Sequence, residues 1–432
     1  MLKHKFFKGL FVLFAVFFSI LPTGCEKAEP VFKCTDSVGC VTIAPDEPIR
    51  IGIIQDLSGG AAAYGTEQVR IIELAVAGRG GRLLGHPVEL QTEDEQCTAE
   101  GGKNAALKFA ARPRMTAIIG TTCSGAAAAA SEVISEAGLV MISGLNSAAS
   151  LTSAGGRQGA DWHPGYFRTR YNDAELGRTP AIYAFQELNV RKVATVNQGD
   201  TYTRGLTDLF EQVFTDLGGQ IVFSAVVYKG DTDMRPLLTG VADSGAELIF
   251  FPTYRPEGDF IVQEVAKMKA DNLLKEGIIL MGCSALLTDD FIKKVNTDGT
   301  GMYFAGSAPV KGPAHDKLIS EYRAKYGDRP SATGYDHGYD AANMLLDAIE
   351  KTAVREKDGT LHIGRGALRE TMYNMTDFKG VTGNLSCDKF GDCGTAGFNI
   401  MRLDDPSAGI EGLTSNVVFT YTPNQQITEI IK

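Results

Sequence analysis

The first residues with an obvious chemistry follow a short apolar run. Thr122, Cys123, Ser124 and Gly125 follow Met115–Gly120 after one intervening residue and precede an alanine-rich segment of helical pattern. The start of a helix carries unpaired N–H groups and a partial positive charge, and both favour a bound carboxylate. Ligands of open α/β sheets bind outside the carboxyl ends of the strands. We therefore expect a carboxylate site here, with Ser124 as a plain helix N-cap as the alternative.

No catalytic motif accompanies this candidate site. The chain has no G-x-x-x-x-G-K-[ST] phosphate loop, and the nearest approach to G-x-S-x-G, at Gly282–Leu286, ends in leucine instead of glycine. The six histidines form neither H-E-x-x-H nor any close metal-binding pair. We predict no catalytic residue, no metal and no cofactor. The pattern favours a binding protein over an exported α/β enzyme.

Composition narrows the range of partners. The chain has 432 residues and a net charge of −10, with 44% hydrophobic residues. An acidic globular chain lacks the basic surface that nucleic-acid binding requires. The length suggests two or three domains, and we expect a monomer that binds a small molecule and no nucleic acid.

The N-terminus has the organisation of an export signal. Three lysines precede Gly9–Leu21, a run that is apolar except for Ser19 and too short to span a membrane. The run continues into Pro22-Thr23-Gly24-Cys25, which resembles the bacterial lipoprotein signal, although Pro22 stands where that signal usually has leucine. The resemblance implies a signal peptide over 1–24, lipidation of Cys25, a tether over 25–47 and an extracytoplasmic, membrane-anchored protein. The alternative is an ordinary secretory signal.

In an oxidising compartment the other cysteines become disulfide candidates. Seven remain after Cys25, so at least one is unpaired in a monomer. The spacing suggests two small loops, Cys34–Cys40 and Cys387–Cys393, with Cys97 and Cys123 as the remaining candidate pair and Cys283 left over. Spacing alone does not determine the pairing, and a four-cysteine zinc site is the runner-up.

The elements that must position these residues alternate between strand and helix. Strands are expected at 49–55, 88–91, 115–120 and 139–143, with helices at 66–77, 101–111 and 126–137. A second series follows, with strands at 192–196, 221–227, 247–252 and 277–282, helices at 203–217, 234–243, 260–270 and 288–295, and later helices at 314–326 and 339–352. Strands that are apolar throughout suit parallel sheets covered on both faces. We predict two similar doubly wound α/β lobes, with the stretch 153–165 and the following 166–171 as the crossing between them.

Several stretches in this order resemble a known family. They are IGIIQDLSGGAAAYG, RGGRLLGHPVEL, EDEQCTAEGGKNAALKFA, AIIGTTCSGAAAAASEVISEAGLVMISGLNSAASLT and GYDAANMLLDAIE. Together they resemble the leucine/isoleucine/valine-binding family of periplasmic solute receptors, over about 380 residues. The resemblance implies a type I periplasmic binding fold with three hinge crossings, in which 48–168 and 308–378 form lobe one and 169–307 and 379–432 form lobe two. It also implies delivery of an amino acid or small acid to the permease of an ABC importer.

The resemblance assigns roles to individual residues. Thr122, Cys123 and Ser124 match the positions that bind the ligand carboxylate. A backbone carbonyl at Leu145 and the hydroxyl of Ser147 match the positions that bind the ligand amino group. Three tyrosines match pocket residues contributed by both lobes: Tyr64, Tyr202 and Tyr254. A Cys97–Cys123 disulfide is also found in the family.

One position departs from the family. An acidic residue usually pairs with the ligand ammonium after the strand at 277–282, where this chain has Cys283 and Ser284. Asp200 or Glu257 are the candidates to replace it. We predict a small carboxylate ligand with high tolerance for loss of the amino group, an apolar or aromatic amino acid being the leading candidate. A ligand sensor of the same fold that signals to a partner protein is the alternative function.

Overall fold

The computed structural model describes residues 1–2, 9, 32–154, 156–394 and 397–421. Cys25 and its predicted lipidation therefore lie outside the described residues. The chain divides into two units, Met1–Lys33 and Cys34–Lys432, and all the elements below belong to the second. Among the helices of the described part, none combines the length and hydropathy needed to cross a membrane.

The first sheet has six strands in the order β3-β4-β2-β5-β6-β9, and only β3 runs antiparallel to its neighbour. Its strands are β2 (Ile49–Gln55), β3 (Arg82–Leu83), β4 (His86–Asp94), β5 (Met115–Gly120), β6 (Met141–Ser143) and β9 (Tyr166–Arg168). In the central register Ile53 pairs with Thr92 on one side and Ile119 on the other. Every residue of β5 is buried, which is why this strand is almost entirely apolar in sequence and shows no alternating pattern.

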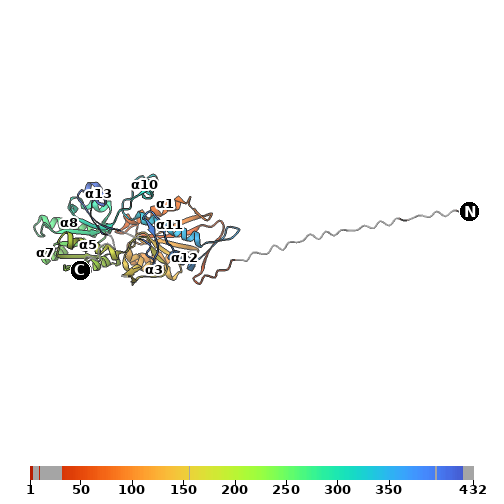
Figure 1. The fold of residues 1–432 in the computed structure, drawn as a ribbon, viewed down its shortest axis with the longest axis horizontal. Helices are drawn as coiled ribbons and strands as arrows, with labels where there is room; N and C mark the ends of the chain where they lie inside the picture. Colours follow the sequence, from red (N-terminus) through yellow and green to blue (C-terminus); the bar gives the residue numbers. More distant parts are fainter. Residues whose placement is uncertain (3–8, 10–31, 155, 395–396, 422–432) are drawn as a thin grey trace. The chain divides into compact units, whose positions relative to one another are not determined.

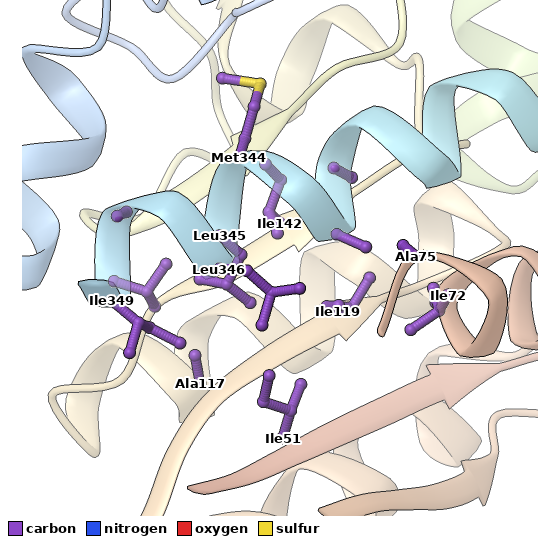
Figure 2. Packing of buried hydrophobic residues seen from close by; sticks show 14 of the residues in the cluster. Ile51, Ile72, Ala75, Ala117, Ile119, Ile142, Met344, Leu345, Leu346 and Ile349 are labelled. Atoms are coloured by element: carbon purple, nitrogen blue, oxygen red, sulfur yellow. The ribbon is translucent and has the colours of Figure 1, made fainter. Parts of the chain in front are cut away.

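Helices cover both faces of this sheet because successive strand residues point in opposite directions. Ile53 packs toward α1 (Ala62–Gly78) and α11 (Tyr335–Thr352), whereas Ile54 packs toward α2 (Ala99–Ala110) and α3 (Ser124–Glu136). Figure 2 shows α11 laid across the sheet, with its side chains over those of the strands. Two further helices pack with the first of these faces: α10 (Pro313–Tyr326) and α12 (Arg365–Tyr373).

The second sheet has seven strands in the order β11-β10-β12-β13-β14-β19-β20, antiparallel from β14 onward. Its strands are β10 (Lys192–Asn197), β11 (Gln220–Val226), β12 (Leu248–Phe250), β13 (Ile279–Cys283), β14 (Tyr303–Ser307), β19 (Phe398–Arg402) and β20 (Val417–Tyr421). Helices α5 (Arg178–Ile182) and α6 (Thr201–Asp216) cover one face. The other face carries α7 (Arg235–Ser244), α8 (Glu257–Ala270), α9 (Asp289–Val295) and α13 (Gly409–Ser415).

The chain passes between the two sheets three times. The first passage follows β9, the second follows β14 and leads to α10, and the third leads into β19. Figure 1 accordingly shows the C-terminal helices α11 and α12 beside α1 and α3, far from their position in the sequence. The predicted fold class, two doubly wound α/β lobes with three crossings, is confirmed.

Three predicted segment assignments need correction. Residues Cys40–Ile43, assigned to the tether, form β1 and pair with β16 (Leu361–Gly364), because Val41 and Ile43 have a place in the core. The stretch 153–165 is not a crossing: it contains a hairpin of β7 (Ser153–Ala154) and β8 (Arg157–Gln158), and the crossing starts only after β9.

The third correction concerns the end of the first lobe, which was predicted at residue 378. The strands β17 (Phe378–Lys379) and β18 (Asn384–Leu385) pair with each other, and Leu385 and Cys393 pack in the core of the first lobe. The backbone of Arg168, in β9, bonds to Gly391 and Cys393. The segment up to Cys393 is therefore held by the first lobe, because hydrogen bonds to β9 and apolar burial both retain it there.

Candidate functional site

Eight of the nine residues expected at a ligand site line one small cavity, which we call the inner chamber. It has a volume of about 40 Å³ and is lined by Ala61, Tyr64, Thr122, Ser124, Leu145, Ser147, Arg170, Tyr202, Tyr254, Ser284 and Ala285. The lining residues come from both lobes and follow the carboxyl ends of β5, β6 and β13. A separate cavity of about 550 Å³, between α10 and α13, includes none of the nine.

The start of α3 forms one wall of the inner chamber. Ser124 is the first residue of the helix and makes no side-chain cap, so the alternative of a plain N-cap is wrong. Its hydroxyl accepts a hydrogen bond from the amide of Ala148 at 3.3 Å. The first amides of any helix lack an intrahelical acceptor. The amides of Ser124 and Gly125 therefore remain as donors for a ligand at this end.

The two preceding amides are already bound by an internal carboxylate. Oε1 of Glu95 accepts from the amide of Thr122 at 3.1 Å and from that of Cys123 at 2.8 Å. Glu95 is fully buried, and its burial raises the pKa of this carboxyl well above its usual range, with Asp56 nearby adding to the shift. Burial therefore disfavours a negative charge on Glu95, beside the helix start where an anion would bind.

The hydroxyl of Thr122 also has internal partners. It accepts from the amide of Asp56 at 3.0 Å and donates to Oε1 of Gln55 at 2.6 Å. These bonds join the ends of β2 and β5. Thr122 lines the inner chamber, but its hydroxyl hydrogen is committed to Gln55.

The loop after β6 supplies the second wall of the lobe-one side. The hydroxyl of Ser143 accepts from the amides of Leu145 at 3.0 Å and Asn146 at 2.9 Å. The side chain of Asn146 accepts from the amide of Thr121 and donates to the carbonyl of Thr122. This network fixes the loop against the end of β5, so that Leu145 and Ser147 both line the chamber.

Tyrosines and a serine close the chamber from the second lobe. The hydroxyls of Tyr202 and Ser284 lie 3.0 Å apart, and the rings of Tyr202 and Tyr254 lie 5.5 Å apart at 37°. From the first lobe, the hydroxyl of Tyr64 donates to the backbone carbonyl of Ser284 at 2.5 Å. This bond connects the two lobes across the site.

A second cavity, the outer chamber, shares Tyr254 with the inner one. It has a volume of about 410 Å³ and is lined by Gly60, Cys97, Thr98, Ala99, Cys123, Gly125, Ala128, Ala129, Gln198, Gly199, Asp200, Thr201, Lys229, Tyr254, Arg255 and Glu257. Cys123, the ninth expected residue, therefore faces the outer chamber. The two chambers meet at the start of α3 and at Tyr254.

Neither acidic residue expected to replace the missing family acid lines the inner chamber. The carboxylate of Asp200 accepts from the amides of Tyr202 and Thr203 and so caps α6. Buried Glu257 accepts from the amide of Gly230 at 2.7 Å and from Gln198 Nε2 at 2.9 Å. Hydrogen bonds within the second lobe thus hold both side chains, and the ammonium side of the inner chamber has no carboxylate among its lining residues.

Sequence reasoning missed Arg170, which lines the inner chamber from the first crossing. Only 5% of Arg170 is exposed. One of its nitrogens donates to the hydroxyl of Tyr171 at 2.9 Å, and its guanidinium lies 4.4 Å from the Tyr171 ring centre. The only signal in the sequence was the pair of arginines in Arg168-Thr169-Arg170, which follows two apolar aromatic residues.

The cysteines pair as expected. Disulfides join Cys34 to Cys40, Cys97 to Cys123 and Cys387 to Cys393. Cys283 is free and buried at the end of β13. The second disulfide ties the loop after β4 to the start of α3 and thereby braces the wall that carries Ser124.

Known proteins are similar to this chain over most of its length. The family model described as periplasmic binding protein matches residues 48–407. The Leu/Ile/Val-binding protein homolog 3 of Brucella melitensis is 25% identical over 362 residues, covering 83% of this chain and 92% of that protein.

Solved structures agree on the fold. A leucine binding protein, LivK, from Thermotoga maritima superposes with a TM-score of 0.75 at 22% identity, over 87% of this chain and 99% of that one. A solute binding protein of an ABC transporter from R. palustris, in complex with 4-hydroxybenzoate, gives a TM-score of 0.71 at 19% identity, over 89% and 100%. Because the family model covers most of the chain and the two-lobed α/β fold is the same, the chain belongs to the periplasmic binding protein family.

Proposed function

We propose that this protein is the solute receptor of an ABC importer and that its solute is a small carboxylate. The observation that carries the proposal is the inner chamber itself. It joins a helix start with free amides, serine hydroxyls and three tyrosines, and it draws these groups from both lobes. Such a chamber can surround a small anion, and none of its groups forms a nucleophile–base pair that would act on it.

The similar proteins support both parts of the proposal. Solved relatives include an ABC transporter protein in complex with isoleucine and others in complex with benzoate or hydroxybenzoates. All of these ligands carry a carboxylate and an apolar body. The shared carboxylate is the part that the start of α3 is suited to bind.

Binding of a panel of carboxylates tests this function. Isoleucine, leucine, benzoate and 4-hydroxybenzoate are titrated by calorimetry, with thermal unfolding recorded in parallel. A ligand that binds only the folded state adds about 2.7 kcal/mol of stability at roughly 100 times its dissociation constant. Ser124→Ala should weaken binding of whichever carboxylate the wild-type protein binds. Ser407→Ala, at an exposed site, should leave that affinity unchanged. Failure of every carboxylate to bind the wild-type protein would reject the proposal.

We also propose that the receptor is anchored through a lipid on Cys25. The support is the signal-like sequence that precedes this cysteine. In Cys25→Ser the protein should leave the membrane fraction or remain unprocessed, as read by fractionation and mass spectrometry. A variant that is cleaved at the same bond and stays in the membrane would contradict the anchor.

A further inference from the structure

Arg170 is a buried cation, and no carboxylate of the described residues forms an ion pair with it. Its one hydrogen bond within the described residues goes to the neutral hydroxyl of Tyr171. By contrast, Arg168, two residues earlier, forms an ion pair with Asp392. Burying a charge without a partner is costly, so such a group is usually compensated by a ligand or a counter-ion.

The position of Arg170 places this charge at a specific end of the inner chamber. A side-chain carbon added at Gly334 would meet Nη1 of Arg170 at 2.7 Å and Cδ2 of Leu145 at 2.8 Å. The side chains of Arg170 and Leu145 therefore both lie against Gly334. Leu145 belongs to the side where the family resemblance expects the ligand ammonium. A cation thus lines the wall where a cationic group was expected to bind.

Two carboxylates interact with Arg170 electrostatically without forming an ion pair with it in the described structure. Burial disfavours its charge, but the neighbouring Tyr171 and Asp336 together raise the pKa of Arg170 above its usual value. Asp336, on α11, and Asp173, on the same crossing, form no ion pair with it among the described residues, and neither lines the inner chamber. Burial lowers the pKa of His337 to about 4, so this ring is neutral at neutral pH.

Building on the proposed function, we propose that the solute is a carboxylate without an ammonium group, which offers a hydrogen-bond acceptor to Arg170. The carboxylate binds at the start of α3, and a keto, hydroxyl or second carboxylate oxygen accepts from the guanidinium. An amino acid would instead place its ammonium beside this cation. With no carboxylate lining the inner chamber, that repulsion has no compensation there.

Matched pairs of ligands test the proposal in the wild-type protein. The pairs are L-leucine with 4-methyl-2-oxopentanoate and L-phenylalanine with phenylpyruvate, each titrated by calorimetry. Hydrogen bonds to charged groups predict roughly 10- to 100-fold tighter binding of the oxo acid. Arg170→Gln should reduce that ratio about tenfold or more, whereas Arg170→Lys should retain a preference for the oxo acid. Arg178→Gln, which removes a charge outside both chambers, should leave the ratio unchanged.

The outcomes separate this inference from the function on which it rests. If the amino acid of each pair binds more tightly in the wild-type protein, the inference is wrong while the carboxylate receptor stands. The same conclusion follows if Arg170→Gln folds and keeps the wild-type ratio. If no carboxylate of either pair or of the earlier panel binds, the proposed function fails, and the inference fails with it.

Discussion

Two arginines in one short segment, Arg168 and Arg170, differ in their surroundings. The guanidinium of Arg168 is enclosed by Asp392, Thr152 and the carbonyl of Ala148. Asp392 also accepts from Asn172, and these contacts keep the pKa of its carboxyl below the usual value despite burial. Arg168 therefore stabilises the crossing, which leaves Arg170 as the cation available to a ligand.

Asp173 gives a prediction about pH at the same scale. It is 3% exposed, neither of its carboxylate oxygens has a hydrogen-bond partner in the described structure, and burial raises its pKa to about 7. An unfolded aspartate has a pKa of about 3.9. The folded state thus binds the proton more tightly, so stability should fall as pH rises from about 4 to about 7, by up to roughly 4 kcal/mol.

Asp173→Asn should remove this part of the pH dependence. Urea unfolding at pH 5 and pH 8 measures it, and the variant should gain stability relative to wild type at pH 8 more than at pH 5. Asp298→Asn, at an exposed position, is the matched control. Equal pH dependence in wild type and Asp173→Asn would show that Asp173 does not titrate in this range.

At the scale of elements, the start of α3 depends on Glu95. This carboxyl, after β4, accepts the amides of Thr122 and Cys123 in the loop after β5. Because burial disfavours the charged form of Glu95, a glutamine is a mild replacement: it is neutral and keeps an accepting oxygen. We expect Glu95→Gln to cost little stability, whereas Glu95→Ala leaves two buried amides unpaired at about 1–3 kcal/mol each.

Chemical unfolding of the two variants compares these costs. A difference of about 2 kcal/mol or more between them supports the role of Glu95 as the acceptor at the helix start. Similar losses in both variants would mean that charge or packing, and not the accepted hydrogen bonds, makes Glu95 important.

The elements near the site were also the most predictable part of the chain. Apolar strands followed by polar residues marked the ends of β5 and β6 correctly, because burial on both faces leaves a simple pattern in the sequence. The environment of Arg170 could not be predicted in the same way. It depends on the ion pair between Arg168 and Asp392, which lie 224 residues apart in the sequence. It also depends on Gly334, which both Arg170 and Leu145 approach closely. Such pairings arise from the crossings, which leave no local pattern.

At the scale of the whole molecule, hydrogen bonds beside the ligand chambers join the two lobes. The hydroxyl of Tyr64 donates to the carbonyl of Ser284, and the ammonium of Lys229 donates to the carbonyl of Gln96 at 2.8 Å. Tyr64, Tyr202 and Tyr254 line the inner chamber, whose volume is only about 40 Å³. A ligand larger than a few water molecules therefore needs the lobes to separate on entry and to close again around it.

Tyr64→Phe tests whether the contact across the lobes contributes to closure. The variant keeps the ring and removes only the donor to Ser284, so we expect about 2- to 10-fold weaker binding of the best carboxylate, from a hydrogen bond worth roughly 0.5–1.5 kcal/mol. X-ray scattering should show a smaller decrease of the radius on ligand addition at a subsaturating concentration. Tyr326→Phe is the control, because this hydroxyl bonds to Arg70 and Glu73 within the first lobe. A radius that does not change in the wild-type protein across a saturating titration would argue against closure. Equal ligand affinities of Tyr64→Phe and Tyr326→Phe would show that the Tyr64 hydrogen bond does not contribute to closure.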